Sequence, residues 1–135
     1  MGLKNILEIL NSFTPEDERE VLTKLESNPR HLIQLFKKTI VDYFVIRDQT
    51  IKLIKKQHPD LNEKDLQKAG DHLTYIKAYE ILIQLDITNL EHLECLQEKP
   101  NAEFMKCAND SLLYFERIEE YDKCIYIRDL LNNLV

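Results

Sequence analysis

The chain has 135 residues and a formal net charge of −6, and 44% of its residues are hydrophobic while 31% are charged. This length is typical of one domain, and the apolar share is large enough for one core, which argues against wholesale disorder. Only two glycines and four prolines occur, whereas a β-rich protein of this size needs many more turn residues. The composition therefore predicts an all-α protein, a single helical domain over residues 1–135 built as a bundle of about five to seven helices.

The N-terminal part of the chain carries two helix signals. Apolar residues recur at helical spacing, which predicts a helix over residues 3–12. Thr14 and Pro15 then supply an N-cap and a first-turn proline, which predict a second helix over residues 15–27. The first stretch lacks a secretory apolar region and a basic polar face, and no run of 18 apolar residues occurs, so we expect no export signal and no membrane contact.

A long helix is predicted over residues 30–57, because its apolar residues recur every three or four positions. It stops before Pro59, since the residue before a proline disfavours helical backbone angles. Between Ile40 and Ile46 the segment is apolar on nearly all sides. We therefore expect this to be the central helix of the bundle, in contact with several others.

Basic side chains are concentrated in residues 37–56, whereas residues 71–135 hold 6 basic and 13 acidic groups and so a net charge of −7. A nucleic-acid-associated protein that uses the basic helix 37–56 is therefore the alternative function. Lys52, Lys55 and Lys56 would contact phosphates, and the affinity would fall steeply with salt. The apolar residues of the same helix argue against this alternative, because they should bury it, and we expect nucleic acid not to be a partner.

Two further helices are predicted before the C-terminal part of the chain. Asn62 caps a helix whose apolar stripe continues to Leu85, and Gly70 inside it marks a point where the helix could break. A short helix follows over residues 89–98. Pro100 then marks the last clear boundary.

The remaining residues, 101–135, are predicted to form a helical hairpin. Asn101 supplies a cap, and apolar residues from Phe104 to Phe115 mark one face of the first helix. We place the turn at residues 118–122, although this stretch contains neither glycine nor proline.

The second half of the hairpin combines an acid, an aromatic residue, two positions of compact packing, an Arg-Asp pair and a leucine stripe. These residues are Glu120, Tyr121, Cys124, Ile125, Ile127, Arg128, Asp129, Leu131 and Leu134. The pattern resembles the UVR motif, a helical hairpin of the UvrB and UvrC excision-repair proteins and of some chaperone-associated proteins. Ile125 departs from it, because the family usually has alanine there, so the two helices should approach less closely. A tetratricopeptide-like pair over residues 114–127 fits less well, since one isolated unit cannot bury its own face.

The resemblance implies protein binding, because hairpins of this family dock against another such hairpin or fold within a larger assembly. We therefore predict a protein-protein interaction module or adaptor, with self-association as an open alternative. The candidate contact residues are Tyr114, Phe115, Tyr121, Arg128 and Asp129, since aromatic residues and arginine concentrate interface energy. The same side chains could instead pack inside this chain, and the sequence leaves both alternatives open.

No pattern in the sequence predicts catalysis, a cofactor or a metal, so we do not expect an enzyme. Two glycines cannot form a glycine-rich phosphate loop, and no Gly-x-Ser-x-Gly motif occurs. His92 and Cys95 share helical spacing, but no second pair of ligands follows, so a metal site is not predicted. The chain has three cysteines, Cys95, Cys107 and Cys124. An odd number favours reduced thiols and hence a cytoplasmic protein.

Overall fold

The computed structural model describes residues 28–98 and 101–134, and within these residues the chain forms helices and no strand. The helices are α3 (Pro29–Gln57), α4 (Glu63–Leu82), α5 (Leu90–Gln97), α6 (Ala102–Arg117) and α7 (Tyr121–Asn132). This architecture confirms the predicted all-α class with a C-terminal hairpin, and the predicted number of helices. None of the described helices is both long and apolar enough to cross a membrane. The helices predicted over residues 3–12 and 15–27 lie outside the described residues.

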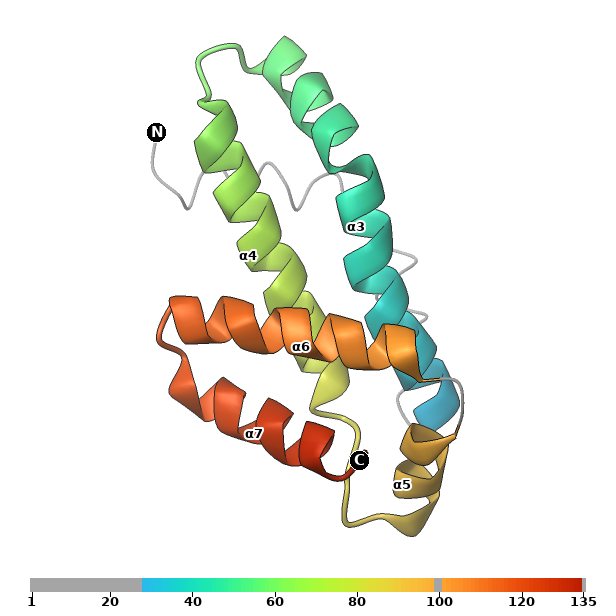
Figure 1. Cartoon of the computed structure of the whole chain (residues 1–135). Coiled ribbons are helices and arrows are strands. Elements are labelled where there is room, and N and C mark those ends of the chain that lie inside the picture. The colour runs from blue at the N-terminus through green and yellow to red at the C-terminus, as the bar shows by residue number, and fades with distance from the viewer. Residues whose placement is uncertain (1–27, 99–100, 135) are drawn as a thin grey trace.

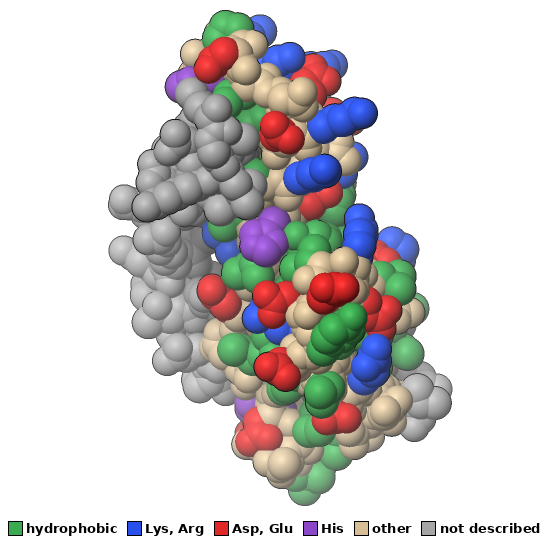
Figure 2. Space-filling model, turned by 90° about the vertical axis from the view of Figure 1, so that its left-hand side faces the viewer, with side chains coloured by type: hydrophobic (Ala, Val, Ile, Leu, Met, Phe, Trp, Pro, Cys, Tyr) green, Lys and Arg blue, Asp and Glu red, His purple; other side chains and the backbone are tan. Residues whose placement is uncertain are grey.

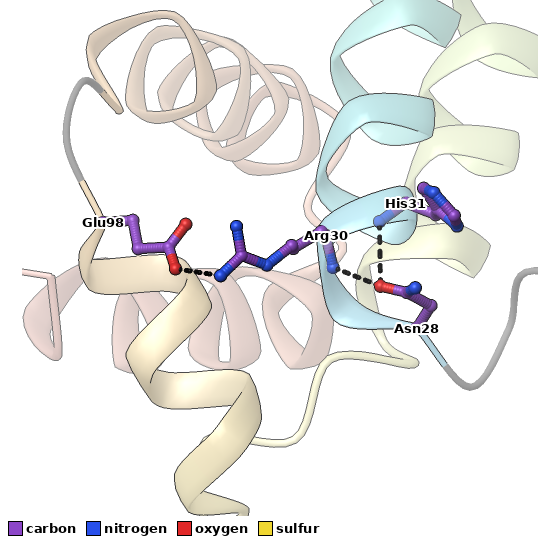
Figure 3. Close-up of polar contacts among 4 residues, drawn as sticks. All are labelled: Asn28, Arg30, His31 and Glu98. Carbon is purple, nitrogen blue, oxygen red and sulfur yellow. Dashed lines mark hydrogen bonds and ion pairs between the residues drawn. The ribbon is translucent and has the colours of Figure 1, made fainter.

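Helices α3 and α4 form a long antiparallel pair (Figure 1). Asn28 Oδ1 accepts hydrogen bonds from the backbone N–H groups of Arg30 (3.0 Å) and His31 (3.4 Å), and Asn62 caps α4 in the same way. Such caps satisfy N–H groups that lack a partner within the helix, and each stabilises it by about 1 kcal/mol. Figure 3 shows the cap of α3 beside a 2.5 Å ion pair between Arg30 and Glu98, which ties the start of α3 to the end of α5.

Helix α4 continues without a break through Gly70, which corrects the expectation that the helix could end there. Tyr43 of α3 lies directly against Gly70, and the hydroxyl of Tyr43 donates a hydrogen bond of 2.8 Å to Asp71. The absence of a side chain at Gly70 therefore makes room for a close contact between α3 and α4, and does not end the helix.

Helices α6 and α7 form a hairpin that crosses the α3–α4 pair at the end where α4 stops (Figure 1). Tyr126 of α7 fixes the hairpin to this end. Its hydroxyl lies within hydrogen-bonding distance of the carbonyl oxygens of Leu82 (3.0 Å), the last residue of α4, and Leu85, just beyond it. Burial raises the pKa of Tyr126 to about 12, so the phenol remains a protonated donor.

Buried apolar side chains form two separate clusters. The larger one includes Phe36 and Phe115 and lies between the hairpin, α5 and the adjoining half of the α3–α4 pair. The smaller one lies at the far end of that pair and consists of Ile51, Ile54, Leu61, Leu66 and Ala69. Between the clusters, Tyr43 and Arg47 of α3 meet Asp71 of α4, and Arg47 Nη1 is 3.6 Å from Asp71 Oδ1. A polar layer therefore divides the interior of the helix pair.

The outer side of α3 is exposed near the middle of the helix. Helix α3 contacts α4, α5 and α6, as expected for a central helix. The side chain of Val45 is nevertheless 75% exposed and that of Ile46 50% exposed. The three contacting helices lie on the side of α3 that carries Phe36 and Ile40. Helix α3 is therefore central, as predicted, although the apolar residues between Ile40 and Ile46 are not all buried.

Candidate functional site

The turn between α6 and α7 is a closed helix cap that contains no glycine. The backbone N–H of Glu119 donates to the carbonyl oxygen of Glu116 (3.1 Å), and that of Glu120 donates to the carbonyl oxygen of Phe115 (2.9 Å). In this arrangement a glycine usually occupies the left-handed position, but here Glu119 does so with φ of 63°. The turn is shorter than the predicted 118–122, because Tyr121 already belongs to α7.

Two of the five predicted contact residues face the core. Phe115 has no exposed surface, and its ring meets the ring of Tyr79 edge-on with the centroids 5.6 Å apart. Tyr114 is 8% exposed, its ring stacks on Tyr75 at 4.6 Å, and its hydroxyl lies 2.7 Å from Nδ1 of His72. These contacts correct the expectation that Tyr114 and Phe115 meet a partner, because α6 turns both side chains towards α4.

The other three predicted contact residues, Tyr121, Arg128 and Asp129, lie on the surface of α7. Tyr121 is 58% exposed, and Ile125, one turn further along α7, is 55% exposed. Arg128 and Asn132 follow at spacings of three and four residues. The four side chains at positions 121, 125, 128 and 132 therefore share one side of the helix.

Helix α6 extends this surface beyond α7. Arg128 Nη2 donates a hydrogen bond of 2.7 Å to Oε1 of Glu116, which joins the two helices at their outer side. Leu113, three residues before Glu116 and on the same side of α6, is 57% exposed. Further from the turn, the two helices border a hollow of about 410 Å³. Its lining residues are Met105, Lys106, Asn109, Asp110, Leu131 and Asn132. We call the surface formed by Leu113, Tyr121, Ile125, Arg128 and Asn132 the hairpin outer face.

Three residues of the hairpin outer face, Leu113, Ile125 and Asn132, are not among the predicted contacts. The sequence contains a signal for Ile125, because it lies four residues after Tyr121 and three before Arg128, which is the spacing of neighbours on a helix. Comparison with the UVR pattern instead treats Ile125 as a bulky residue at a small position. Leu113 has no comparable signal, since it belongs to an unbroken apolar run in α6.

The hairpin outer face is bordered by carboxylates. The nearby cations have partners within the chain, since Lys123 lies 3.7 Å from a glutamate one turn earlier and Arg117 lies over a tyrosine ring. Glu119, Asp122 and Asp129 are exposed carboxylates in the same region. Figure 2, which views the molecule from the side of the hairpin turn, shows apolar side chains among acidic ones over this region. A cationic partner is therefore favoured here over an anionic one.

The basic helix offers fewer free cations than its composition indicates. Among the three predicted phosphate contacts, Lys55 Nζ lies 3.7 Å from Oε1 of Glu63, whereas Lys52 and Lys56 are exposed. Further along α3, Arg47 pairs with carboxylates as well. Two exposed lysines would neutralise few phosphates, and the electrostatic affinity for nucleic acid grows with the number of phosphates neutralised.

The described residues contain no group of three or more His, Cys, Asp and Glu side chains placed to hold a metal ion. Burial raises the pKa of the Cys107 and Cys124 thiols, which keeps both protonated and poorly nucleophilic. His92 accepts a hydrogen bond of 3.0 Å from the backbone N–H of Asp86, so this side chain stabilises the loop before α5. Burial and hydrogen bonding within the chain therefore account for these histidine and cysteine side chains.

Comparison of the chain with protein-family models, with curated proteins and with solved structures gives no match. The resemblance of residues 120–134 to the UVR motif thus stays a prediction. Function is inferred below from the surface chemistry of the hairpin.

Proposed function

We propose that this protein is a non-catalytic, cytoplasmic protein-protein interaction module that binds another protein through the hairpin outer face. The observation that supports this most directly is the exposure of Tyr121 and Ile125 on a helix that is otherwise firmly packed. Cys124, Ile127 and Leu130, on the opposite side of α7, are completely buried. Large apolar side chains on such a rigid support lose little conformational entropy on binding, so more of their burial contributes to affinity.

Arg128 gives this surface a polar anchor beside its apolar residues. The 2.7 Å bond to Glu116 fixes the guanidinium group while the side chain remains half exposed. Its remaining N–H groups can donate to carboxylate or carbonyl oxygens of a partner. Tyrosine and arginine at the centre of an interface each contribute about 2 kcal/mol or more when they are removed from water.

The nucleic-acid alternative has less support than protein binding. Its candidate residues are Lys52, Lys55 and Lys56, of which Lys55 is paired with Glu63. If retention of the protein on DNA were sensitive to salt and were lost when these three lysines are replaced by glutamine, the alternative would replace the present proposal.

The proposal is tested by affinity capture from extracts of the source cell, with the purified full chain as bait. The hairpin variant carries Tyr121→Ala and Ile125→Asp, and the control variant carries Leu90→Asp, because Leu90 of α5 is also apolar and 69% exposed. We expect a protein that is retained by the wild type and the control but not by the hairpin variant. That protein is then purified and titrated against all three, and its Kd should rise at least about tenfold for the hairpin variant alone. Equal retention by all three, with equal Kd, would contradict the proposal.

A further inference from the structure

A second exposed face of the molecule combines apolar residues with charge of the opposite sign. Val41 and Val45 of α3 are exposed, and lysines precede and follow them along the helix. The residues Lys38, Val41, Val45, Lys52 and Lys56 are three, four and seven positions apart, which keeps them on one side of α3. We call this row the α3 outer face. This row lies on the side of α3 opposite the buried residues that pack against α4.

The α3 outer face and the hairpin outer face are complementary in chemistry. The first places lysines around two valines. The second places Glu119, Asp122 and Asp129 around Tyr121 and Ile125, and its own cation, Arg128, is paired with Glu116. In both cases the apolar residues are accompanied by charges one or two helical turns away. Contact between the two faces would bury apolar surface from both helices while opposite charges meet at the rim.

We propose that the α3 outer face of one chain binds the hairpin outer face of a second copy of this chain. This inference rests on the proposed function, in which the hairpin outer face is a protein-binding surface. Contact between two identical faces is disfavoured, because carboxylates would meet carboxylates in one case and lysines would meet lysines in the other. Contact between unlike faces removes both repulsions, so the charge pattern selects this arrangement among the possible self-contacts.

Two aspartates reduce the positive charge of α3 but do not cancel it. Asp48 lies 3.7 Å from Nε of Arg47, which also pairs with Asp71, so the charge of Asp48 is only partly compensated. Asp42 is exposed beside the row. Against these two carboxylates stand three lysines, Lys38, Lys52 and Lys56, all of them exposed. The α3 outer face therefore keeps an excess of positive charge.

The positions of the two faces make the contact head-to-tail. The turn of the hairpin lies at the left of Figure 1, whereas α3 runs along the right-hand side of the molecule. One chain therefore cannot bring its own two faces together. A pair formed in this way still has one free face of each kind, so further copies can add to it until a ring closes.

The test measures the mass of the purified full chain by light scattering and sedimentation, from about 10 µM to about 1 mM. We expect the mass to rise above the 16.1 kDa of one chain with concentration at low salt. It should fall back towards one chain at about 1 M salt, where interactions between exposed charges are screened.

Two charge-reversed variants then locate the contact. One carries Lys52→Glu and Lys56→Glu on α3, and the other carries Asp122→Lys and Asp129→Lys on α7. Each variant alone should associate at least about tenfold more weakly than the wild type. An equal mixture should restore association, because the wild-type hairpin outer face of the first variant can meet the wild-type α3 outer face of the second, and the two reversed faces also carry opposite charges. Lys64→Glu with Lys68→Glu is the matched control, since these lysines of α4 are also exposed and four residues apart.

Several results would overturn this inference without touching the proposed function. These are a mass of one chain over the whole concentration range, an unchanged association of either charge-reversed variant, or a mixture that does not associate. The inference about self-association would then be discarded, whereas loss of a different captured protein by the Tyr121→Ala and Ile125→Asp variant would still support the hairpin as a binding surface. Circular dichroism of each variant, all of whose substitutions are at exposed positions, establishes that folding is retained.

Discussion

The phenol of Tyr43 occupies the space next to Gly70 that the side chain of any other residue would fill. A methyl group at position 70 would overlap with the hydroxyl oxygen of Tyr43 and would lie 3.2 Å from its Cζ atom. The same approach brings the hydroxyl to 2.8 Å from Asp71. Close packing of the two helices and the polar layer between the clusters therefore depend on one glycine.

Replacing this glycine with alanine should destabilise the protein. Steric overlap in a packed interior costs about 1 to 3 kcal/mol, and the gain in helix propensity offsets about 1 kcal/mol of it, so the net loss should be up to about 2 kcal/mol. Urea unfolding of Gly70→Ala gives the loss. The penalty should shrink when Tyr43→Phe is introduced, because the overlapping hydroxyl is then absent. An equal penalty in both backgrounds would show that Tyr43 is not its cause.

Glu119→Gly is expected to stabilise the protein. Glu119 has φ of 63°, and a left-handed backbone costs a residue with a side chain about 1 kcal/mol more than glycine. The hydrogen bonds that close the turn use backbone atoms only, so the substitution leaves them intact. The gain should be about 0.5 to 1 kcal/mol in thermal or urea unfolding. Glu120→Gly is the control, because its φ is negative and no gain is expected there.

The inward and outward sides of the hairpin should respond differently to truncation. Phe115→Ala removes a fully buried ring and should cost about 3 to 5 kcal/mol, which is a large part of the stability of a domain of this size. Tyr121→Ala changes a side chain that is 58% exposed and should cost less than about 1 kcal/mol. Urea unfolding of both variants checks this. A large loss for Tyr121→Ala would mean that this tyrosine supports the fold and would weaken the case for the hairpin outer face.

Stability at alkaline pH should depend on Tyr126. Its pKa is raised to about 12 in the folded protein by burial, whereas an unfolded tyrosine has a pKa of about 10. The contribution is therefore fully present below pH 10 and is lost as the pH rises towards 12, because only the unfolded chain then releases the proton. Tyr126→Phe should lower stability at pH 8 by about 1 kcal/mol through the lost hydrogen bond, and should make the decline above pH 10 shallower. If stability declined as steeply as in the wild type, the decline would be due to Tyr75 instead, because burial also raises the pKa of Tyr75 to about 12.

Local signals in the sequence were sufficient to predict most of the described fold. Asn62 and Pro59 mark helix ends because caps and prolines act within one turn of the chain, and their effect does not depend on distant residues. Gly70 misled the prediction, since its role depends on Tyr43, which is 27 residues away in the sequence. The turn at Glu119 was placed nearly correctly, although it lacks the glycine that usually identifies such a turn.

The candidate site was harder to predict than the fold. Tyr114 and Tyr121 have the same chemistry, and only the rotation of α6 and α7 against α4 decides which of them is buried. Periodicity predicts that a helix has two sides, but it does not reveal which neighbours cover each side. Ile125 illustrates this, because its exposure is evident only once Cys124 and Ile127 are seen to face the core.

The layer formed by Tyr43, Arg47 and Asp71 should also divide the helix pair into two units that open separately. The far unit holds the smaller apolar cluster, which includes Ile54 and Leu66, and it receives no support from the hairpin. Backbone amides there should exchange with deuterium through local opening, at a lower free energy than amides close to the larger cluster, which exchange only with global unfolding. Fragment-resolved exchange measurements would detect this difference as a protected half and a labile half of the same two helices.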